Sequence, residues 1–423
     1  MLWISICIIV FIITLIIMYV KLKYRSRFWS KQPVFHIYDI YYWFYVSWGR
    51  KYNKTKIIRD GLPDKNKFTN FNPSEMKIYC SSKKNTINNI FKYVLDISTF
   101  PEKEFVDFIS NNYLREREIK YNPTHEQIMH YFIGHEKPYY MCLYYDEEKQ
   151  IDASNQIIYG NKLIGCISGR PLNVNYYKAD KQFVSNYVDF LCVHKHNRKR
   201  GVSQQLIQTI EYIMNHNNPS INTCIFKRDG TLTNIIPMSV FSSYIYDILK
   251  WKKPQKVNNE YVLFNMNKGN YHMCLNKLNI DMKKHFDCAI VPYINNIYSV
   301  CNDSVGMYVY VLKHKHNDNI LAYYVFRNSS TIYNNYETLE MISSLKTNKC
   351  KMNDFNTGFH NAMFNCFKKA NYKYLLIENI SHNDYIINEL SKSKKYTHVI
   401  PSAYYFYNFL SVPIHHNKLF VIC

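Results

Sequence analysis

The chain has 423 residues, a hydrophobic content of 47% and a formal net charge of +21. This length allows roughly two to three domains, and the hydrophobic content excludes an intrinsically disordered chain. The 12 cysteines form no CxxC pair, which excludes a small disulfide-stapled scaffold and indicates reduced core thiols. The 40 tyrosines and the abundant lysine, asparagine and isoleucine are typical of AT-rich coding DNA. Much of the positive charge is therefore scattered lysine, and we expect no nucleic-acid partner.

Residues 1–20 predict a single transmembrane anchor. Leu2 to Val20 contains no charged residue, and as a helix it would rise about 28 Å, close to the thickness of the hydrocarbon core. A secretory signal would show a basic segment and a small-residue cleavage site, and the sequence has neither. Basic residues follow directly, so the positive-inside rule places the rest of the chain in the cytoplasm. An uncleaved interfacial helix is the alternative. The basic residues are Lys21, Lys23, Arg25 and Arg27.

Residues 21–75 show few periodic runs and are interpreted as an irregular arm. A first α/β half is expected over residues 76–255. Apolar residues at helical spacing predict two helices near its start, and apolar runs predict strands after them. The expected elements are helices over 86–97 and 104–114, strands over 139–145 and 161–171 around a polar loop at 146–161, a strand over 188–193, a helix over 202–214 and a strand over 223–227.

A second half, residues 256–423, repeats this order. Its segment 306–327 predicts a hairpin with a turn near Asn317 to Asn319. The expected elements that follow are an amphipathic helix over 354–370 and strands over 372–378, 404–410 and 418–423. The same order of elements, a hairpin followed by a strand, a helix and a strand, thus occurs twice. We predict an internal duplication of an α/β unit (α+β, mixed sheet).

The segment "VDFLCVHKHNRKRGVSQQLI", residues 188–207, carries the clearest chemistry. A strand that feeds a helix leaves the first backbone N–H groups of the helix unpaired at the turn, where they favour an anion. Gly201 allows a close backbone approach, and Arg198, Lys199 and Arg200 add positive charge. The pattern indicates a pyrophosphate cradle, with a solvated basic loop as the alternative.

The segment "HEQIMH" raises the question of a zinc site. Metal-binding helices place two histidines at i and i+4, whereas His125 and His130 are five residues apart and point in different directions. We expect no metal site.

The basic segment resembles the signature of the eukaryotic N-myristoyltransferase family, which runs "FLCVHK" into a basic turn and a helix. The likeness extends in the family's order over residues 27–423, and this chain is identified as a divergent member. "RFWSKQPV" is similar to the family's "FW.TQPV", "NNYLREREIKYNPTHEQI" to "NENYV…YSPEFL", "LIGCISGRP" to "LVGFISAIP", "TLTNIIP" to "TAGVVLP", and "YYFYNFLSVP" to "YYLYNWKCP".

The resemblance implies two acetyltransferase-like (GNAT-like) halves related by pseudo-twofold symmetry, the second of which binds peptide and supplies the catalytic C-terminus. It implies transfer of myristoyl from myristoyl-CoA to the N-terminal glycine of a protein, by a monomer without a further cofactor. The α-carboxylate of Cys423 would be the general base, and the backbone N–H groups of Phe190 and Leu191 the oxyanion hole. Thr231 would hold the amine. Acyl-CoA would be bound by Phe28, Trp29, Leu191, Val193, Arg198, Lys199, Arg200, Gly201, Val202 and Ser203.

Two segments depart from the family. The acidic run that binds basic peptide residues is replaced by Arg115, Glu116, Arg117 and Glu118, and the family's "RYWH" by "YIYD", Tyr244 to Asp247. These departures leave two alternatives open. One is an N-acyltransferase with another acyl chain or acceptor, and the other is an inactive, membrane-tethered protein that binds acyl-CoA or peptides.

Overall fold

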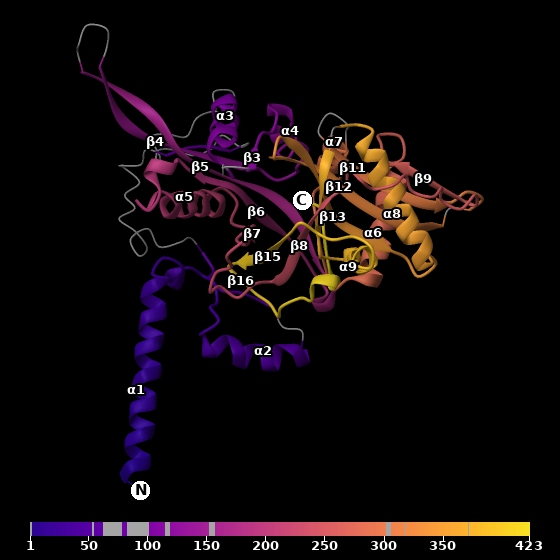
Figure 1. Ribbon diagram of the computed structural model, residues 1–423. Helices are drawn as coiled ribbons and strands as arrows, with labels where there is room; N and C mark the ends of the chain where they lie inside the picture. The colour runs from indigo at the N-terminus through magenta and orange to yellow at the C-terminus, as the bar shows by residue number, and fades with distance from the viewer. Residues whose placement is uncertain are drawn as a thin grey trace.

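A mixed β-sheet of 15 strands forms the centre of the molecule, with helices packed on its faces (Figure 1). The computed structural model describes residues 2–52, 55–61, 78–82, 101–114, 119–151, 157–301, 306–317, 319–370 and 372–423. The expected mixed α/β fold is confirmed. The order of strands along the main path of the sheet is β17, β10, β5, β6, β7, β15, β8, β14, β13, β12, β11 and β9.

The first half of the chain contributes a hairpin and a parallel strand pair. Strands β4, β5 and β6 pair antiparallel, and β6 then pairs parallel with β7 after the intervening helix α5. Long apolar stretches form the strands because both faces of the sheet are covered. The elements are β2 (Ile78–Ser82), α3 (Glu102–Asn112), β3 (Ile119–Tyr121), α4 (His125–Met129), β4 (Tyr140–Ile151), β5 (Ile157–Tyr176), β6 (Lys181–Val193), α5 (Val202–Asn217), β7 (Cys224–Asp229) and β8 (Ser239–Asp247).

The second half repeats this connectivity. Strands β11, β12 and β13 pair antiparallel, and β13 pairs parallel with β14 after helix α8. The elements are β9 (Tyr261–Asn265), α6 (Tyr271–His285), β10 (Cys288–Val291), α7 (Ile294–Val300), β11 (Met307–His314), β12 (Ile320–Tyr333), β13 (Tyr336–Lys346), α8 (Met352–Phe367), β14 (Tyr372–Glu378), α9 (Asn383–Leu390), β15 (His398–Tyr407), β16 (Phe409–Leu410) and β17 (Leu419–Val421).

The two halves exchange their last strands. After β7 the chain continues into β8, which pairs with β14 of the second half; after β14 it continues into β15, which pairs with β7 of the first half. Strands β8 and β15 also pair with each other. This reciprocal arrangement joins the halves into one sheet, as a duplicated unit requires.

Register shifts interrupt the equivalent strand pairs. In the β5–β6 pair, the shift lies between Cys166 and Ser168, opposite Phe190. In the β12–β13 pair, it lies between Val325 and Phe326. An extra residue in one strand bends the ladder and redirects its side chains. The β12–β13 pair has a second shift, between Asn328 and Ile332, so the pair of each half carries at least one bulge.

The arm at residues 21–75 differs from the expectation of an irregular segment. It contains the end of α1 (Leu2–Arg25), the helix α2 (Ile40–Tyr52) and the strand β1 (Lys56–Ile57), which pairs with β16. Helix α2 is apolar on almost all sides, so it lacks the simple stripe by which amphipathic helices are recognised. Strands β4 and β5 also extend through most of the expected polar loop at 146–161. The helix predicted over 86–97 lies outside the described residues.

Helix α1 projects away from the globular part of the molecule (Figure 1). Its segment Trp3–Tyr24 has a mean hydropathy of 2.9 and is not buried against the protein. The hydroxyl of Thr14 donates to the carbonyl oxygen of Val10 at 2.8 Å, which satisfies this polar group within the helix. By length and composition α1 is able to cross a membrane.

Candidate functional site

The strand, turn and helix predicted around residue 195 are present as β6, a short 3-10 turn at Lys195–Asn197 and α5. Gly201 precedes the helix with φ of 82°, a left-handed conformation that favours glycine. Gln204 Oε1 is the nearest atom that a Cβ at this position would meet, at 3.9 Å. The glycine is therefore required by backbone conformation rather than by lack of space.

A cavity of about 520 Å³ lies at this helix start, and we call it the cationic cavity. The first N–H groups of a helix have no partner within it and favour an anion. Arg198 is fixed at the cavity by a bond from its Nε to the carbonyl oxygen of Val193, at 3.2 Å. The structure brings these predicted acyl-CoA residues together in its wall: Leu191, Val193, Arg198, Lys199, Gly201, Val202 and Ser203.

The register shift in β6 gives Phe190 an unusual backbone conformation. Its φ is 53°, a region that residues with a side chain rarely adopt and that is concentrated at functional sites. The N–H of Phe190 donates to Asp189 Oδ1 at 2.7 Å rather than to a neighbouring strand. The shift therefore turns a backbone donor out of the ladder, as the predicted oxyanion hole would need.

A second cavity, of about 610 Å³, lies on the other side of this shift, and we call it the central cavity. It shares Tyr113 and Leu114 with the cationic cavity. Asp189 and Phe190 line the central cavity, while the next residue, Leu191, lines the cationic one. The two cavities thus meet at the bulged segment of β6.

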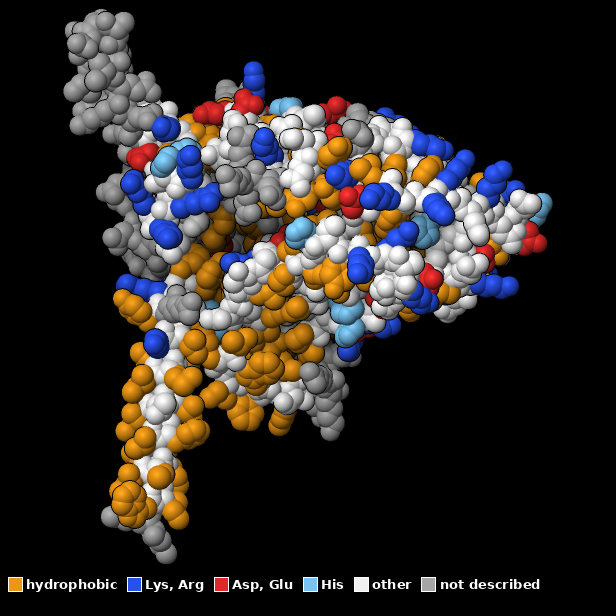
Figure 2. Space-filling model, viewed as in Figure 1, with side chains coloured by type: hydrophobic (Ala, Val, Ile, Leu, Met, Phe, Trp, Pro, Cys, Tyr) orange, Lys and Arg blue, Asp and Glu red, His pale blue; other side chains and the backbone are white. Residues whose placement is uncertain are grey.

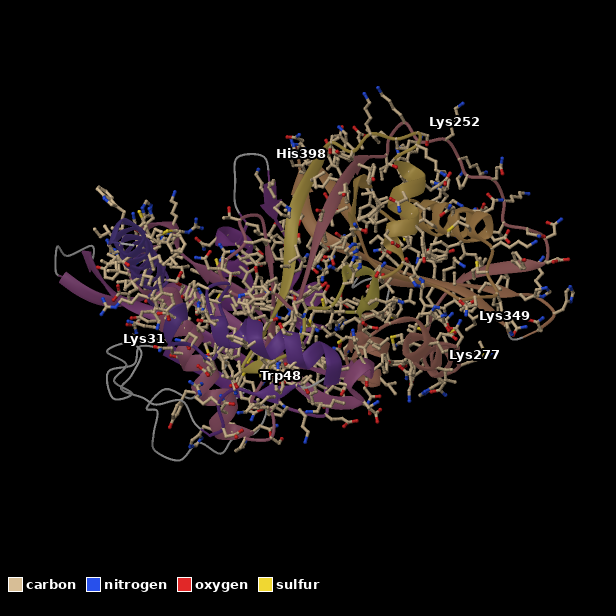
Figure 3. The ribbon with its side chains drawn as sticks, turned by 90° about the horizontal axis from the view of Figure 1, so that it is seen from below. Lys31, Trp48, Lys252, Lys277, Lys349 and His398 are labelled. Carbon is tan, nitrogen blue, oxygen red and sulfur yellow. The ribbon has the colours of Figure 1, made fainter. Side chains whose placement is uncertain are left out.

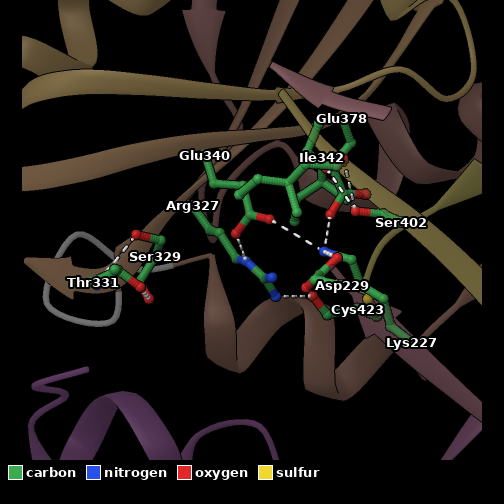
Figure 4. A network of polar contacts seen from close by, with 12 residues as sticks. Lys227, Asp229, Arg327, Ser329, Thr331, Glu340, Ile342, Glu378, Ser402 and Cys423 are labelled. Atoms are coloured by element: carbon green, nitrogen blue, oxygen red, sulfur yellow. Dashed lines mark hydrogen bonds and ion pairs between the residues drawn. The ribbon is translucent and has the colours of Figure 1, made fainter. Parts of the chain in front are cut away.

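A network of charged side chains forms one wall of the central cavity (Figure 4). Arg327 on β12 donates from Nε to Glu340 Oε2 on β13 at 2.6 Å. Lys227 on β7 lies 2.5 Å from Glu378 Oε1 on β14 and 3.8 Å from Glu340 Oε1. The network therefore connects strands from both halves of the duplicated fold.

Attraction between opposite charges keeps part of this network ionised. Burial alone would raise the pKa of Glu340, but Arg327 and Lys227 hold it at about 2. Burial raises the pKa of Glu378 to about 8, against the attraction of Lys227 and with the repulsion of Glu340. With Glu378 neutral, the two cations face Glu340, Asp229, which lies 3.4 Å from Lys227, and the C-terminus, to which Arg327 donates.

This arrangement predicts a pH-dependent stability. The folded protein raises the pKa of Glu378 above the ordinary value of 4.5, so its contribution is complete at low pH and is lost as pH rises through about 8. Between pH 6 and 9 the free energy of unfolding should fall by roughly 3 kcal/mol more in the wild type than in Glu378→Gln. Urea unfolding at both pH values measures this difference. Glu389→Gln, at an exposed position, is the control and should follow the wild type. Parallel curves for wild type and Glu378→Gln would contradict the assignment.

The C-terminus ends beside the network. Strand β17 pairs with β10, and the N–H of Ile422 donates to the carbonyl oxygen of Ile290 at 2.9 Å. Cys423 is 3% exposed, and Arg327 Nη1 donates to its main-chain oxygen at 3.0 Å. The expectation of a terminus tucked inside the fold is confirmed. Arg327 itself lines the central cavity, so the α-carboxylate lies directly behind that wall. Burial raises the pKa of the Cys423 thiol, which keeps the thiol neutral.

Other predicted site residues lie apart from the two cavities. Trp29 stacks on Phe226, with ring centroids 5.9 Å apart, and contacts Phe28. Thr231 is exposed and accepts a bond from Arg228 at its carbonyl oxygen. Of the residues that the structure describes, the lining of the two cavities does not include these or Arg200. The charged run 115–118 lies outside the described residues.

The two histidines of "HEQIMH" have separate partners. His130 lies 3.3 Å from Glu126, one turn earlier, and His125 lies 3.6 Å from Glu102 on α3. Among the described residues, no group of three or more potential metal ligands is found.

Sequence reasoning missed the charged network. Its signal was a charged residue within each of several apolar strands, in the segments "YYVFR", "TLEMI" and "LLIE". Buried charges are rare unless paired, so these positions marked candidates for a site. Their pairing across strands is visible only in the fold.

The comparisons agree with this geometry. Residues 80–242 match the family described as "Myristoyl-CoA:protein N-myristoyltransferase, N-terminal domain". The fold is similar to that of Saccharomyces cerevisiae N-myristoyltransferase with bound myristoyl-CoA, with a TM-score of 0.65 and 15% identity over 94% of this chain and 99% of that one. A structure of the yeast enzyme with myristoyl-CoA and inhibitors is similar with a TM-score of 0.62 and 15% identity, over 92% of this chain and 91% of that one. No curated protein sequence matches the chain.

The duplicated sheet with a bulged strand over a cationic helix start is thus shared with the fold of the yeast enzyme. The match over residues 80–242 and the shared fold both point to the N-myristoyltransferase family.

Proposed function

We propose that the protein transfers myristoyl from myristoyl-CoA to the N-terminal glycine of a protein or peptide. The observation that carries this proposal is the meeting of the two cavities at the bulge of β6. An acyl-CoA with its phosphates in the cationic cavity would present its thioester at Phe190 and Leu191, and an amine in the central cavity would reach it from the other side.

On this proposal, the thioester oxygen replaces the Asp189 carboxylate as acceptor of the Phe190 N–H. Negative charge develops on that oxygen during attack, and a fixed backbone donor stabilises it there. Attack forms the amide C–N bond and breaks the C–S bond, and CoA leaves as the thiol. Thr231 is proposed near the amine, and Phe28 and Trp29 near the nucleotide, by the family resemblance.

A base is required because a glycine ammonium has no lone pair. We propose the α-carboxylate of Cys423 in this role. The bond from Arg327 weakens the proton affinity of this carboxylate. The weakening is reduced because Arg327 is also paired with Glu340, at 2.6 Å. Burial of the terminus further opposes its negative charge and so favours proton uptake from the amine.

Turnover with myristoyl-CoA and a panel of peptides that begin with glycine tests the function. Amide formation on glycine peptides, absent with their N-acetylated forms, supports the proposal. Preference for another acyl-CoA in competition would favour the related acyltransferase, and binding without turnover would favour the inactive binder.

The cationic cavity predicts which arginine contributes to acyl-CoA affinity. Arg198→Ala should weaken acyl-CoA binding by about 1–3 kcal/mol, because a charge-assisted hydrogen bond to phosphate is lost. The maximal rate should fall less, since the phosphates are bound equally in ground and transition states. Calorimetric titration with myristoyl-CoA measures the change. Arg200→Ala, two residues away but outside the cavity wall, is the matched control. Equal losses in both variants would place the phosphates elsewhere.

We also propose that α1 anchors the protein in a membrane, with the remainder of the chain in the cytoplasm. The apolar length of Trp3–Tyr24 and the basic residues beyond it support this orientation. Cytoplasmic exposure would give the cationic cavity access to acyl-CoA.

A further inference from the structure

Helix α2 exposes large apolar side chains on the surface of the globular part. Ile40, Phe44 and Trp48 are 71%, 69% and 71% exposed, and they recur every fourth residue along one side of the helix. Contiguous apolar surface of this kind marks an interaction site. We call the following set the aromatic face: Ile37, Ile40, Tyr41, Trp43, Phe44 and Trp48.

The opposite side of α2 is already occupied by the fold. Tyr42 and Val46 are buried and belong to a cluster with Leu410 and Val412. The hydroxyl of Tyr42 donates to the carbonyl oxygen of Ser411 at 3.3 Å. The helix therefore cannot rotate to bury the aromatic face without giving up this packing. Apolar residues on both sides of a helix indicate a second apolar environment outside the protein.

The aromatic face lies beside α1. Helix α2 runs crosswise to α1 along the underside of the domain (Figure 1). In the same view, hydrophobic side chains gather over this underside (Figure 2). Seen from below, α2 lies in front of the globular part, with Trp48 labelled on it (Figure 3). Tyr19 of α1 contacts Tyr38, immediately before α2, with ring centroids 5.6 Å apart. The two apolar surfaces are thus adjacent.

The charges and polar groups around the aromatic face suit a membrane surface. Exposed basic residues lie at the domain end of α1, where they could meet anionic headgroups: Lys21, Lys23, Arg27 and Lys31. The indole N–H of Trp43 donates to the carbonyl oxygen of Ile37 at 2.8 Å, so this ring can enter an apolar layer with its donor satisfied. Tryptophan and tyrosine are enriched at membrane interfaces for such reasons.

We propose that α2 is a second membrane contact, which lies in the interface of the same bilayer that α1 crosses. Its 13 residues would rise about 20 Å, too short to span the hydrocarbon core but suited to lying flat on it. The contact holds the catalytic domain against the membrane in one orientation rather than on a free tether. This inference rests on the proposed anchoring by α1 and is independent of the proposed acyl transfer.

Photo-cross-linking in the full-length protein tests the proposal. The photoreactive residue p-benzoylphenylalanine is placed at position 44 on α2, at position 12 on α1, or at position 133. The last is the matched control, because Ile133 is 48% exposed and follows α4, on the side of the domain away from α2 (Figure 1). The protein is reconstituted in vesicles of phosphatidylcholine and phosphatidylserine, illuminated, and analysed by mass spectrometry for lipid adducts.

We expect lipid adducts at positions 12 and 44, with at least about tenfold less at 133, because an interfacial helix keeps its apolar face among the acyl chains. Adducts at 12 without adducts at 44 would overturn the inference while leaving the anchor intact. Adducts at neither position would overturn both the anchor and the α2 contact. A protein–protein cross-link at 44 would show that a second copy covers the aromatic face. Turnover of the same reconstituted samples reports the acyltransferase proposal separately.

Discussion

Blocking the terminal carboxylate should lower the maximal rate by about 10² to 10⁴, the usual contribution of a general base. An enzyme assembled with Cys423 as an amide retains every side chain and the strand β17, but it lacks the ionisable group. In water, a proton would move from an α-amino group with a pKa near 8 to an α-carboxyl group near 3.5 at a cost of about 6 kcal/mol. The buried site must reduce this cost, and an amide there cannot accept the proton at all.

The position of the carboxylate should matter, and the identity of the last side chain should not. Cys423→Ala is the matched control and should keep most of the activity, because the thiol is buried and neutral. Deletion of Ile422 and Cys423, or a C-terminal extension, should behave like the amide. Acyl-CoA affinity should remain nearly unchanged in all of them, since the cationic cavity lies on the other side of the β6 shift. Native turnover by the amidated enzyme would require a different base.

Local pattern predicted those parts of the fold whose sequence is periodic over a whole element. The strand β14 and the helices α5 and α8 were placed within a few residues of their observed ends. Most of the cationic cavity was also predictable, because its lining residues between Leu191 and Gln204 lie in one short segment and the turn before Gly201 determines their geometry. Resemblance to a family then linked this turn to acyl-CoA.

Features that depend on contacts between distant segments could not be predicted in this way. Whether β8 pairs with β14 or with β7 is decided by the packing of the two halves, and no local period records it. The same is true of the network of Lys227 and Glu378, which are 151 residues apart. Helix α2 was missed for a different reason. Its apolar residues surround the helix, because one side faces the protein and the other is proposed to face lipid.

Removal of Arg327 should destabilise the protein by about 3–5 kcal/mol, because it leaves buried carboxylates without their partner. Arg327 bonds both Glu340 and the main-chain oxygen of Cys423, and it is 23% exposed at its side chain. Arg327→Met keeps the length of the apolar stem while removing the charge. The loss should appear as a lower denaturation midpoint with an unchanged dependence on denaturant concentration.

The double variant Arg327→Met, Glu340→Met separates the lost charge from the lost packing. If an uncompensated carboxylate causes the instability, replacing Glu340 as well should recover most of the stability, since a buried ion pair and an apolar pair of similar volume differ little. Without Arg327, the buried carboxylate at Cys423 lacks the cation that favours its charged form, so it binds a proton more strongly and is a stronger base once ionised. We therefore expect the double variant to be stable yet to show its activity displaced toward higher pH relative to the wild type. A loss in the double variant equal to the sum of the losses in Arg327→Met and Glu340→Met would show that the two residues are not coupled and that an uncompensated carboxylate is not the cause of the instability.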